Sequence, residues 1–171
     1  MLSRSVLNLG TTLGLLAALG AGCATGKSQT ASSHTGVHIT QLPDRLRVDI
    51  DGALFTQYFY KDVPRPYCYP VMGPGEAPMT RNWPMQDAPN ESHDHPHHRS
   101  LWFAIGLING QDFWSEQKGF GKTVQVALTE VRSGPRVGII KSRNKWVAPD
   151  GKVVCTDERT LRIYEPKDPA E

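Results

Sequence analysis

The chain has 171 residues, with 19 basic and 17 acidic side chains and a formal net charge of +2. Its charges are scattered and no run of five or six like charges occurs, so no nucleic-acid partner is expected. The 16 glycines and 13 prolines argue against a mainly helical protein and favour one turn-rich β domain.

Residues 1–23 are typical of a secretory signal peptide. Arg4 precedes an uncharged stretch, Val6–Gly22, which is too short and too glycine-rich for a membrane span. The stretch ends at Cys23 and is similar to a lipoprotein signal, although the large aliphatic residue lies four positions before the cysteine instead of three. Lipid attachment at Cys23 and ordinary cleavage nearby are therefore both open. We expect a polar tether over 24–36 and an exported protein, periplasmic or membrane-anchored as a lipoprotein, without a transmembrane span in the mature chain.

The region 37–165 is predicted to form one all-β domain, an antiparallel β-sandwich. Apolar and polar residues alternate over 46–50, and a second β-rich run covers 53–60. Asp51-Gly52 between them predicts a hairpin. A short strand is expected over 67–72.

The last third of the chain is predicted to be a three-stranded meander. Its strands are expected over 123–131, 137–147 and 153–164, separated by turns at residues 133–135 and 148–151. No amphipathic helix of ten or more residues is found, which is why a sandwich of antiparallel sheets is the expected architecture.

A long proline-rich loop, residues 74–96, precedes the segment whose side chains are the strongest candidates for binding or catalysis. Loops of this length inside a compact domain are usually functional or mobile. The loop leads into His93–Arg99, which holds four of the six histidines of the chain. Burying several imidazoles costs free energy unless each ring finds polar partners, so packing explains the cluster poorly.

The first functional interpretation of the cluster is a divalent metal site. In an extended segment His93, His95 and His97 point to one side and are candidate metal ligands. Asp94 or Asp112 could provide an oxygen ligand or orient a ring. The spacing matches no specific zinc motif, so the cofactor remains unassigned.

The second interpretation is acid–base chemistry on a sugar or polyol. Histidine exchanges protons near neutral pH. Trp102 and Trp114 flank the cluster in sequence, and the faces of their rings suit stacking on a sugar. Asp112 and Glu116 add carboxylates close to the same point.

Two further interpretations need no chemistry. The same groups could bind an oligosaccharide or another small molecule without turnover. Alternatively, hydrogen bonds from the imidazoles to the backbone could simply fix the loop, or the tract could be merely solvated.

Three features outside the cluster carry weaker expectations. Cys68 and Cys155 lie in apolar, strand-like runs and are expected to be free thiols. Trp83 and Trp146 are expected in the core or at its rim. Asp157-Glu158-Arg159 in the last strand could face a pocket, but cross-strand ion pairs on a solvated face are favoured.

The histidine segment also resembles a known family. Residues 93–104, His-Asp-His-Pro-His-His-Arg-Ser-Leu-Trp-Phe-Ala, and residues 109–114, Asn-Gly-Gln-Asp-Phe-Trp, are similar to the hallmark of the PmoA-like family. These are exported proteins common in planctomycetes and related bacteria. Ser100 stands where the family usually has glycine. The segments 143–146, 149–153 and 157–161 are also similar, so that the resemblance covers 38–164.

The resemblance implies a β-sandwich protein of the kind found alongside sugar-degrading enzymes. The family bears the name "methane oxygenase PmoA", which would imply a metal-dependent oxygenase. The membrane methane monooxygenase subunit of that name is built from several membrane-spanning helices, whereas this chain has no stretch of about 20 apolar residues after Cys23. Family members typically continue well beyond the last predicted strand, so the resemblance implies a domain that is incomplete at its C-terminus, followed here by a polar tail over 166–171.

The leading hypothesis is an exported domain that acts on or binds a carbohydrate. His95, His97 and His98 would form its polar centre. Arg99 would clamp an anionic or hydroxyl group, and Asp112 would orient a histidine. Trp102, Trp114 and Glu116 would contact the substrate. The alternatives are a metal-dependent oxygenase and a non-catalytic glycan-binding or structural module.

Overall fold

The computed structural model describes residues 35–166, so the predicted signal peptide, almost all of the tether and most of the polar tail lie outside the described residues. Its elements are, in chain order, β1 (Val37–Gln41), β2 (Arg45–Ile50), β3 (Ala53–Phe59), β4 (Tyr67–Val71), the 3-10 helix η1 (Pro74–Glu76), β5 (Leu101–Trp102), β6 (Leu107–Ile108), β7 (Gln111–Asp112), β8 (Lys122–Arg132), β9 (Val137–Val147) and β10 (Val153–Tyr164). Within 35–166 no helix is long and apolar enough to cross a membrane.

The first sheet contains five antiparallel strands in the order β1-β2-β3-β4-β5. The β2–β3 turn is tight because Asp51 and Gly52 both have positive φ, +52° and +83°. This is the backbone that a two-residue hairpin turn requires and that the Asp-Gly pair adopts readily. The Asp51 carboxylate also accepts a hydrogen bond of 2.7 Å from the amide of Gly36, which fixes the start of β1.

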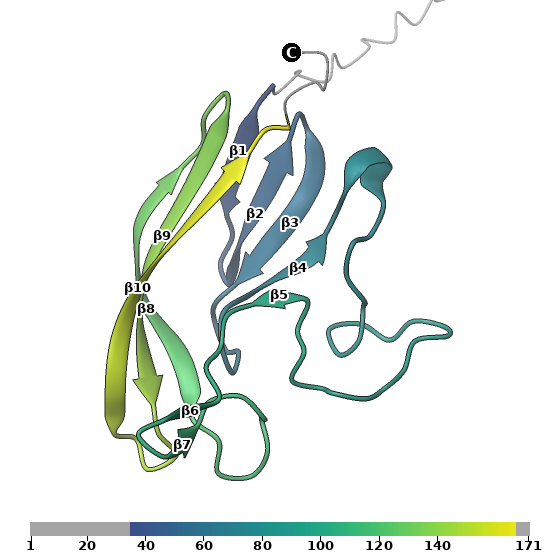
Figure 1. The fold of residues 1–171 in the computed structure, drawn as a ribbon. Coiled ribbons are helices and arrows are strands. Elements are labelled where there is room, and N and C mark those ends of the chain that lie inside the picture. The colour runs from purple at the N-terminus through teal and green to yellow at the C-terminus, as the bar shows by residue number, and fades with distance from the viewer. Residues whose placement is uncertain (1–34, 167–171) are drawn as a thin grey trace, which may run out of the picture. The chain divides into compact units, whose positions relative to one another are not determined.

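The second sheet contains three antiparallel strands in the order β10-β9-β8. Figure 1 shows this sheet beside the five-stranded one. Along the central strand β9, residues of even number face inward and are buried, whereas Arg143 and Lys145 are exposed. This period of two is the alternation expected of a strand with one buried face.

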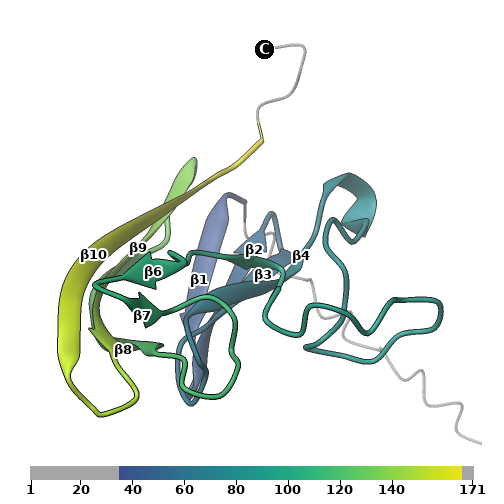
Figure 2. The same ribbon diagram turned by 60° about the horizontal axis from the view of Figure 1, so that its bottom comes forward.

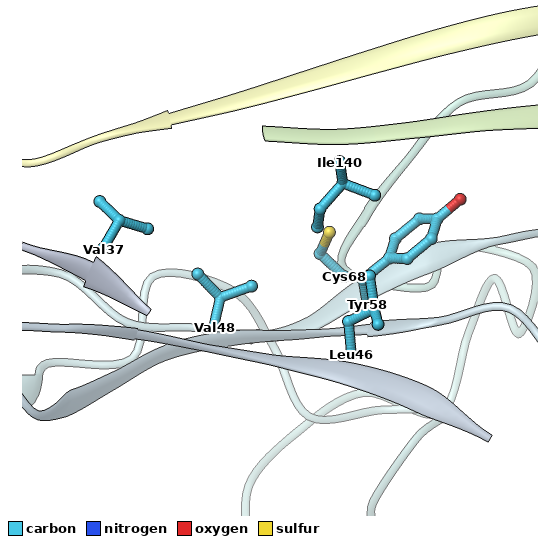
Figure 3. Close-up of a cluster of buried hydrophobic side chains, with 6 residues drawn as sticks. All are labelled: Val37, Leu46, Val48, Tyr58, Cys68 and Ile140. Atoms are coloured by element: carbon cyan, nitrogen blue, oxygen red, sulfur yellow. The ribbon is translucent and has the colours of Figure 1, made fainter. Parts of the chain in front are cut away.

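The hydrophobic core lies between the two sheets. It is formed by buried side chains from both, Val37, Leu46, Val48, Tyr58, Cys68 and Ile140. Figure 3 shows Ile140 of β9 directed toward the five side chains of the other sheet. Gly138 allows this close approach, because a Cβ atom there would lie 2.6 Å from a methyl carbon of Val37.

The short β6–β7 hairpin forms a third, two-stranded sheet at one end of β8–β10 (Figure 1, Figure 2). Phe113 follows it and is only 1% exposed. Its ring packs edge-to-face on Trp146 with centroids 5.1 Å apart. The hairpin thereby ties the segment after the histidine cluster to the second sheet.

The predicted all-β sandwich is confirmed, and the predicted strands end within a residue or two of the observed ones. Cys68 and Cys155 are free thiols as expected, and Trp146 is a core residue. The prediction of cross-strand ion pairs on a solvated face is wrong in part, because Asp157 and Arg159 do form an ion pair of 2.8 Å, but within β10 and away from the solvated face. Both side chains are part-buried on the inward face, where Asp157 accepts hydrogen bonds from Asn144, Trp146 and Arg159. Alternation indicates that their odd-numbered positions share a face but not which face is buried.

Candidate functional site

The proline-rich loop between β4 and β5 is held in place by specific side chains. The Glu91 carboxylate accepts hydrogen bonds of 2.8 Å from the amides of both Asn82 and Trp83. These backbone bonds hold the pKa of Glu91 below its usual value. Further along, Arg81 donates to the Asp94 carboxylate at 2.6 Å and to the carbonyl of His95 at 2.8 Å. These contacts therefore fix the position of the loop at the start of the histidine segment.

A turn gathers three of the imidazoles. The amide of His98 donates to the carbonyl of His95 at 2.9 Å, and His95 has a positive φ of +43°. The ring of His98 lies 4.9 Å from that of His95 in a stacked arrangement and 4.4 Å from that of His97 in an edge-to-face arrangement. His95, His97 and His98 are thus brought together, as the leading hypothesis required.

His93 does not join this group. Its ring stacks on Trp83 with centroids 4.1 Å apart, and its Nε2 atom lies 2.8 Å from a carboxylate oxygen of Asp87. The expectation that His93, His95 and His97 share one side assumed an extended segment. The turn at His95 replaces that alternation with a compact arrangement of the last three histidines.

Two indoles complete the wall of a pocket beside these rings. Trp102 and Trp114 pack together with centroids 4.8 Å apart. The His98 ring lies 5.9 Å from each indole, and His97 lies 6.1 Å from Trp114. The pocket, here called the imidazole–indole pocket, has a volume of about 380 Å³ and is lined by His98, Ser100, Trp102, Phe103, Ala104 and Trp114.

A layer of paired charges supports the indoles. Arg65 is 1% exposed, and its guanidinium lies 4.7 Å from the Trp102 centroid. The same group donates to the carbonyl of Trp114 at 3.1 Å and lies 3.5 Å from the Glu116 carboxylate. Arg99 reaches the other side of Glu116 through two hydrogen bonds, of 3.1 and 2.8 Å. Glu116 is therefore the shared counter-ion of two arginines.

These contacts give Arg99, Glu116 and Asp112 different surroundings from those expected. Arg99 directs its guanidinium to Glu116, which leaves that carboxylate paired with arginines and not turned to a ligand. Asp112 accepts hydrogen bonds from the amides of Trp114 and Ser115, at 2.7 and 3.1 Å, and from the Ser115 hydroxyl. It fixes the loop that carries Trp114 and, among the described residues, it orients none of the imidazoles.

The surroundings favour uncharged imidazoles in the pocket. Burial, and then the neighbouring histidines, lower the pKa of His97, with a further contribution from the cation of Arg65. Burial, followed by His95 and Arg81, lowers the pKa of His98. Near neutral pH both rings are therefore neutral, so each can donate one hydrogen bond and accept another.

Comparison with known families assigns the chain. A model for a family of unknown function, DUF6807, matches residues 45–170. The chain belongs to this family. Neither the curated proteins nor the solved structures that were compared gave a match.

The described part of this DUF6807 domain brings together no group of three or more His, Cys, Asp or Glu side chains suited to hold one metal ion. His93 is engaged elsewhere, and the three remaining imidazoles pack against one another and against Trp102 and Trp114. The described residues therefore do not fit a metal site shared by His93, His95 and His97.

Sequence reasoning did not select Arg65 as part of the DUF6807 site. It lies between β3 and β4, in Asp62-Val63-Pro64-Arg65-Pro66, about 30 positions before the histidines. A single arginine flanked by prolines carries no signal of burial, since arginine is seldom fully buried. Only the chain path, which brings this segment beneath Trp102, reveals its place.

Proposed function

We propose that this DUF6807 domain binds a neutral carbohydrate in the imidazole–indole pocket, and that His97 or His98 exchanges a proton with it. The observation that carries the proposal is the meeting of two indoles with the imidazole of His98 at one pocket, with the His97 ring packed against His98 and Trp114 beside it. Aromatic faces stack on the apolar faces of sugar rings, while imidazole nitrogens bond hydroxyl groups.

The charges near the pocket favour an uncharged ligand. Arg65 and Arg99 are both paired with Glu116, and the Asp112 carboxylate is used by its own loop. A charged ligand would have to compete with these pairs. A hydroxyl-bearing ligand needs only the imidazoles and the exposed indole face of Trp114, which is 41% exposed.

Proton exchange is supported by the protonation state of the imidazoles. A neutral His97 or His98 can accept a proton from a sugar hydroxyl or from water, as a general base does. Binding without turnover uses the same contacts, so the proposal has two forms, an enzyme and a glycan-binding module. Incubation with a bound glycan followed by product analysis separates them.

A larger hollow of about 700 Å³ runs along β8, between that strand and Tyr60, Lys61 and Asp62. Its lining includes neither histidine nor tryptophan. We assign the ligand to the smaller pocket because groups for stacking and for proton exchange both line it, whereas the hollow along β8 has neither.

We also propose the finer family assignment and the location. The motif residues 93–104 and 109–114 support membership of the PmoA-like family within the broader assignment. The features of residues 1–23 support export, with Cys23 as a candidate lipid anchor. The oxygenase function implied by that family's name gains no support from the arrangement of the histidines.

Calorimetric titration of the mature chain with a panel of neutral oligosaccharides tests the proposal. We expect His98→Ala and Trp114→Ala to abolish binding with little change in melting temperature. Leu107→Ala is the matched control, because Leu107 is an apolar side chain, 71% exposed and outside the pocket lining. Binding that survives both pocket variants, or that Leu107→Ala removes equally, would contradict the proposal.

A further inference from the structure

The described residues leave two long strand edges unpaired. In the order β10-β9-β8 the outer strands are β10 and β8, with 12 and 11 residues. An unpaired edge exposes a row of backbone donors and acceptors, which can pair with another strand. The other sheet offers less, because β5 has two residues and β1 is bridged to Gly134.

The two long edges differ in regularity. The register of β8 against β9 shifts twice, between Gln125 and Ala127 and again between Leu128 and Glu130. Such bulges interrupt further pairing and are a common protection of sheet edges. The β10 strand shifts only at its start and then runs regularly from Cys155 to Tyr164. The β10 edge therefore lacks the protection that bulges give to β8.

Two charged residues on this edge have no ion-pair partner within residues 35–166. Glu158 and Arg162 are both exposed on the outward face of β10. They are four positions apart in an extended strand, which separates them by roughly 13 Å, too far to pair within one strand. Opposite charges at this spacing match a second copy of the same strand that runs in the opposite direction.

We propose that this face is a homodimer interface in which β10 of one copy pairs antiparallel with β10 of a second copy, centred on Thr160. In that register each Glu158 lies opposite an Arg162 of the partner, so the two-fold symmetry forms the ion pair twice. The inward faces of the two sheets then lie on the same side, because residues paired across an antiparallel ladder share a face.

Neighbouring symmetric registers are less favourable. A pairing centred on Arg159 sets two arginines opposite each other, and one centred on Glu158 sets two carboxylates opposite each other. Like charges in directly opposed positions destabilise a strand pair. A pairing centred on Leu161 sets Asp157 opposite Glu165 of the second copy and forms no ion pair. The register centred on Thr160 also pairs Arg159 with Leu161 and opposes no like charges along the strand.

Analytical ultracentrifugation of the mature chain tests the interface by charge reversal. We expect a concentration-dependent dimer, and we expect Glu158→Arg or Arg162→Glu alone to raise its dissociation constant roughly tenfold. The double variant Glu158→Arg/Arg162→Glu restores both opposed pairs and should restore dimerisation. Lys145→Glu is the control, because it reverses an exposed charge on the central strand.

Each variant is also checked for its melting temperature. Glu158 lies beside Arg143 in the sheet register, so Glu158→Arg also creates a repulsion within one subunit. Arg162 lies beside the uncharged Ile139, so Arg162→Glu gives the same test without that effect. A wild-type chain that stays monomeric at the highest soluble concentration would overturn the proposal. The proposal would also be overturned if neither single reversal changed the dissociation constant of the dimer. It would equally be overturned if the double variant dimerised as weakly as the single variants.

Discussion

The guanidinium of Arg65 lies 4.7 Å from the centre of the Trp102 ring. A buried cation on an aromatic face is stabilised by the ring's quadrupole. The same guanidinium also bonds the carbonyl of Trp114. One residue far from the histidines in sequence therefore holds both indoles of the pocket.

Removal of this cation should destabilise the folded domain. We predict that Arg65→Met lowers the free energy of unfolding by roughly 3 kcal/mol, because it breaks a buried ion pair with Glu116 and leaves the indoles without their common contact. Arg65→Lys keeps the charge but loses the planar group, and should cost less. Urea denaturation measures both. Equal stability of Arg65→Met and the wild type would show that these contacts contribute little.

The pH dependence of binding follows from the imidazoles. Because the pKa values of His97 and His98 are lowered in the folded chain, both rings are neutral at pH 7. As the pH falls through these lowered values the rings gain protons and positive charge. We predict that glycan affinity is constant from pH 8 to 7 and falls in acid. Titration of the imidazole resonances by NMR gives the pKa values directly, and values above about 6.5 would contradict this reasoning.

The same shifts predict how stability varies with pH. An unfolded chain with ordinary histidine pKa values binds protons below about pH 6.5 more readily than the folded chain does. The contribution of these two rings to stability is therefore present above that pH and is lost as the pH falls through the lowered folded values. The double variant His97→Gln/His98→Gln should flatten this part of the pH–stability curve.

Packing between the sheets gives a further test at Gly138. A Cβ atom there would lie 2.6 Å from a methyl carbon of Val37, so Gly138→Ala forces the sheets apart. Overpacking of this kind typically costs about 1–3 kcal/mol. Gly106→Ala is the matched control, because a Cβ atom at Gly106 would meet nothing within 4 Å. If thermal unfolding is unchanged in Gly138→Ala, the sheets are not packed as closely as described.

Most of the fold could be predicted because its signals are local. Alternation marks β2, turn residues separate β8, β9 and β10, and the Asp51-Gly52 pair specifies its own turn. The short strands β5, β6 and β7 could not be predicted, since two-residue strands carry no period and depend on partners elsewhere in the chain. The inward position of Asp157 depends on long-range packing in the same way.

The candidate site could be predicted only in part. The local density of imidazoles and the nearness of two tryptophans in sequence pointed to His97, His98, Trp102 and Trp114. The roles of neighbouring charged residues could not be predicted, because the ion-pair partners of a carboxylate such as Glu116 are set by the three-dimensional fold. The place of Arg65 in the site could not be predicted for the same reason.

The measurement that tests the central claim most directly is an NMR titration of the mature chain with a neutral oligosaccharide that it binds. The proposal predicts that the imidazole resonances of His97 and His98 and the indole resonances of Trp102 and Trp114 shift together and saturate at one dissociation constant. Shifts confined to the hollow along β8, with these four side chains unmoved, would contradict a binding site in the imidazole–indole pocket.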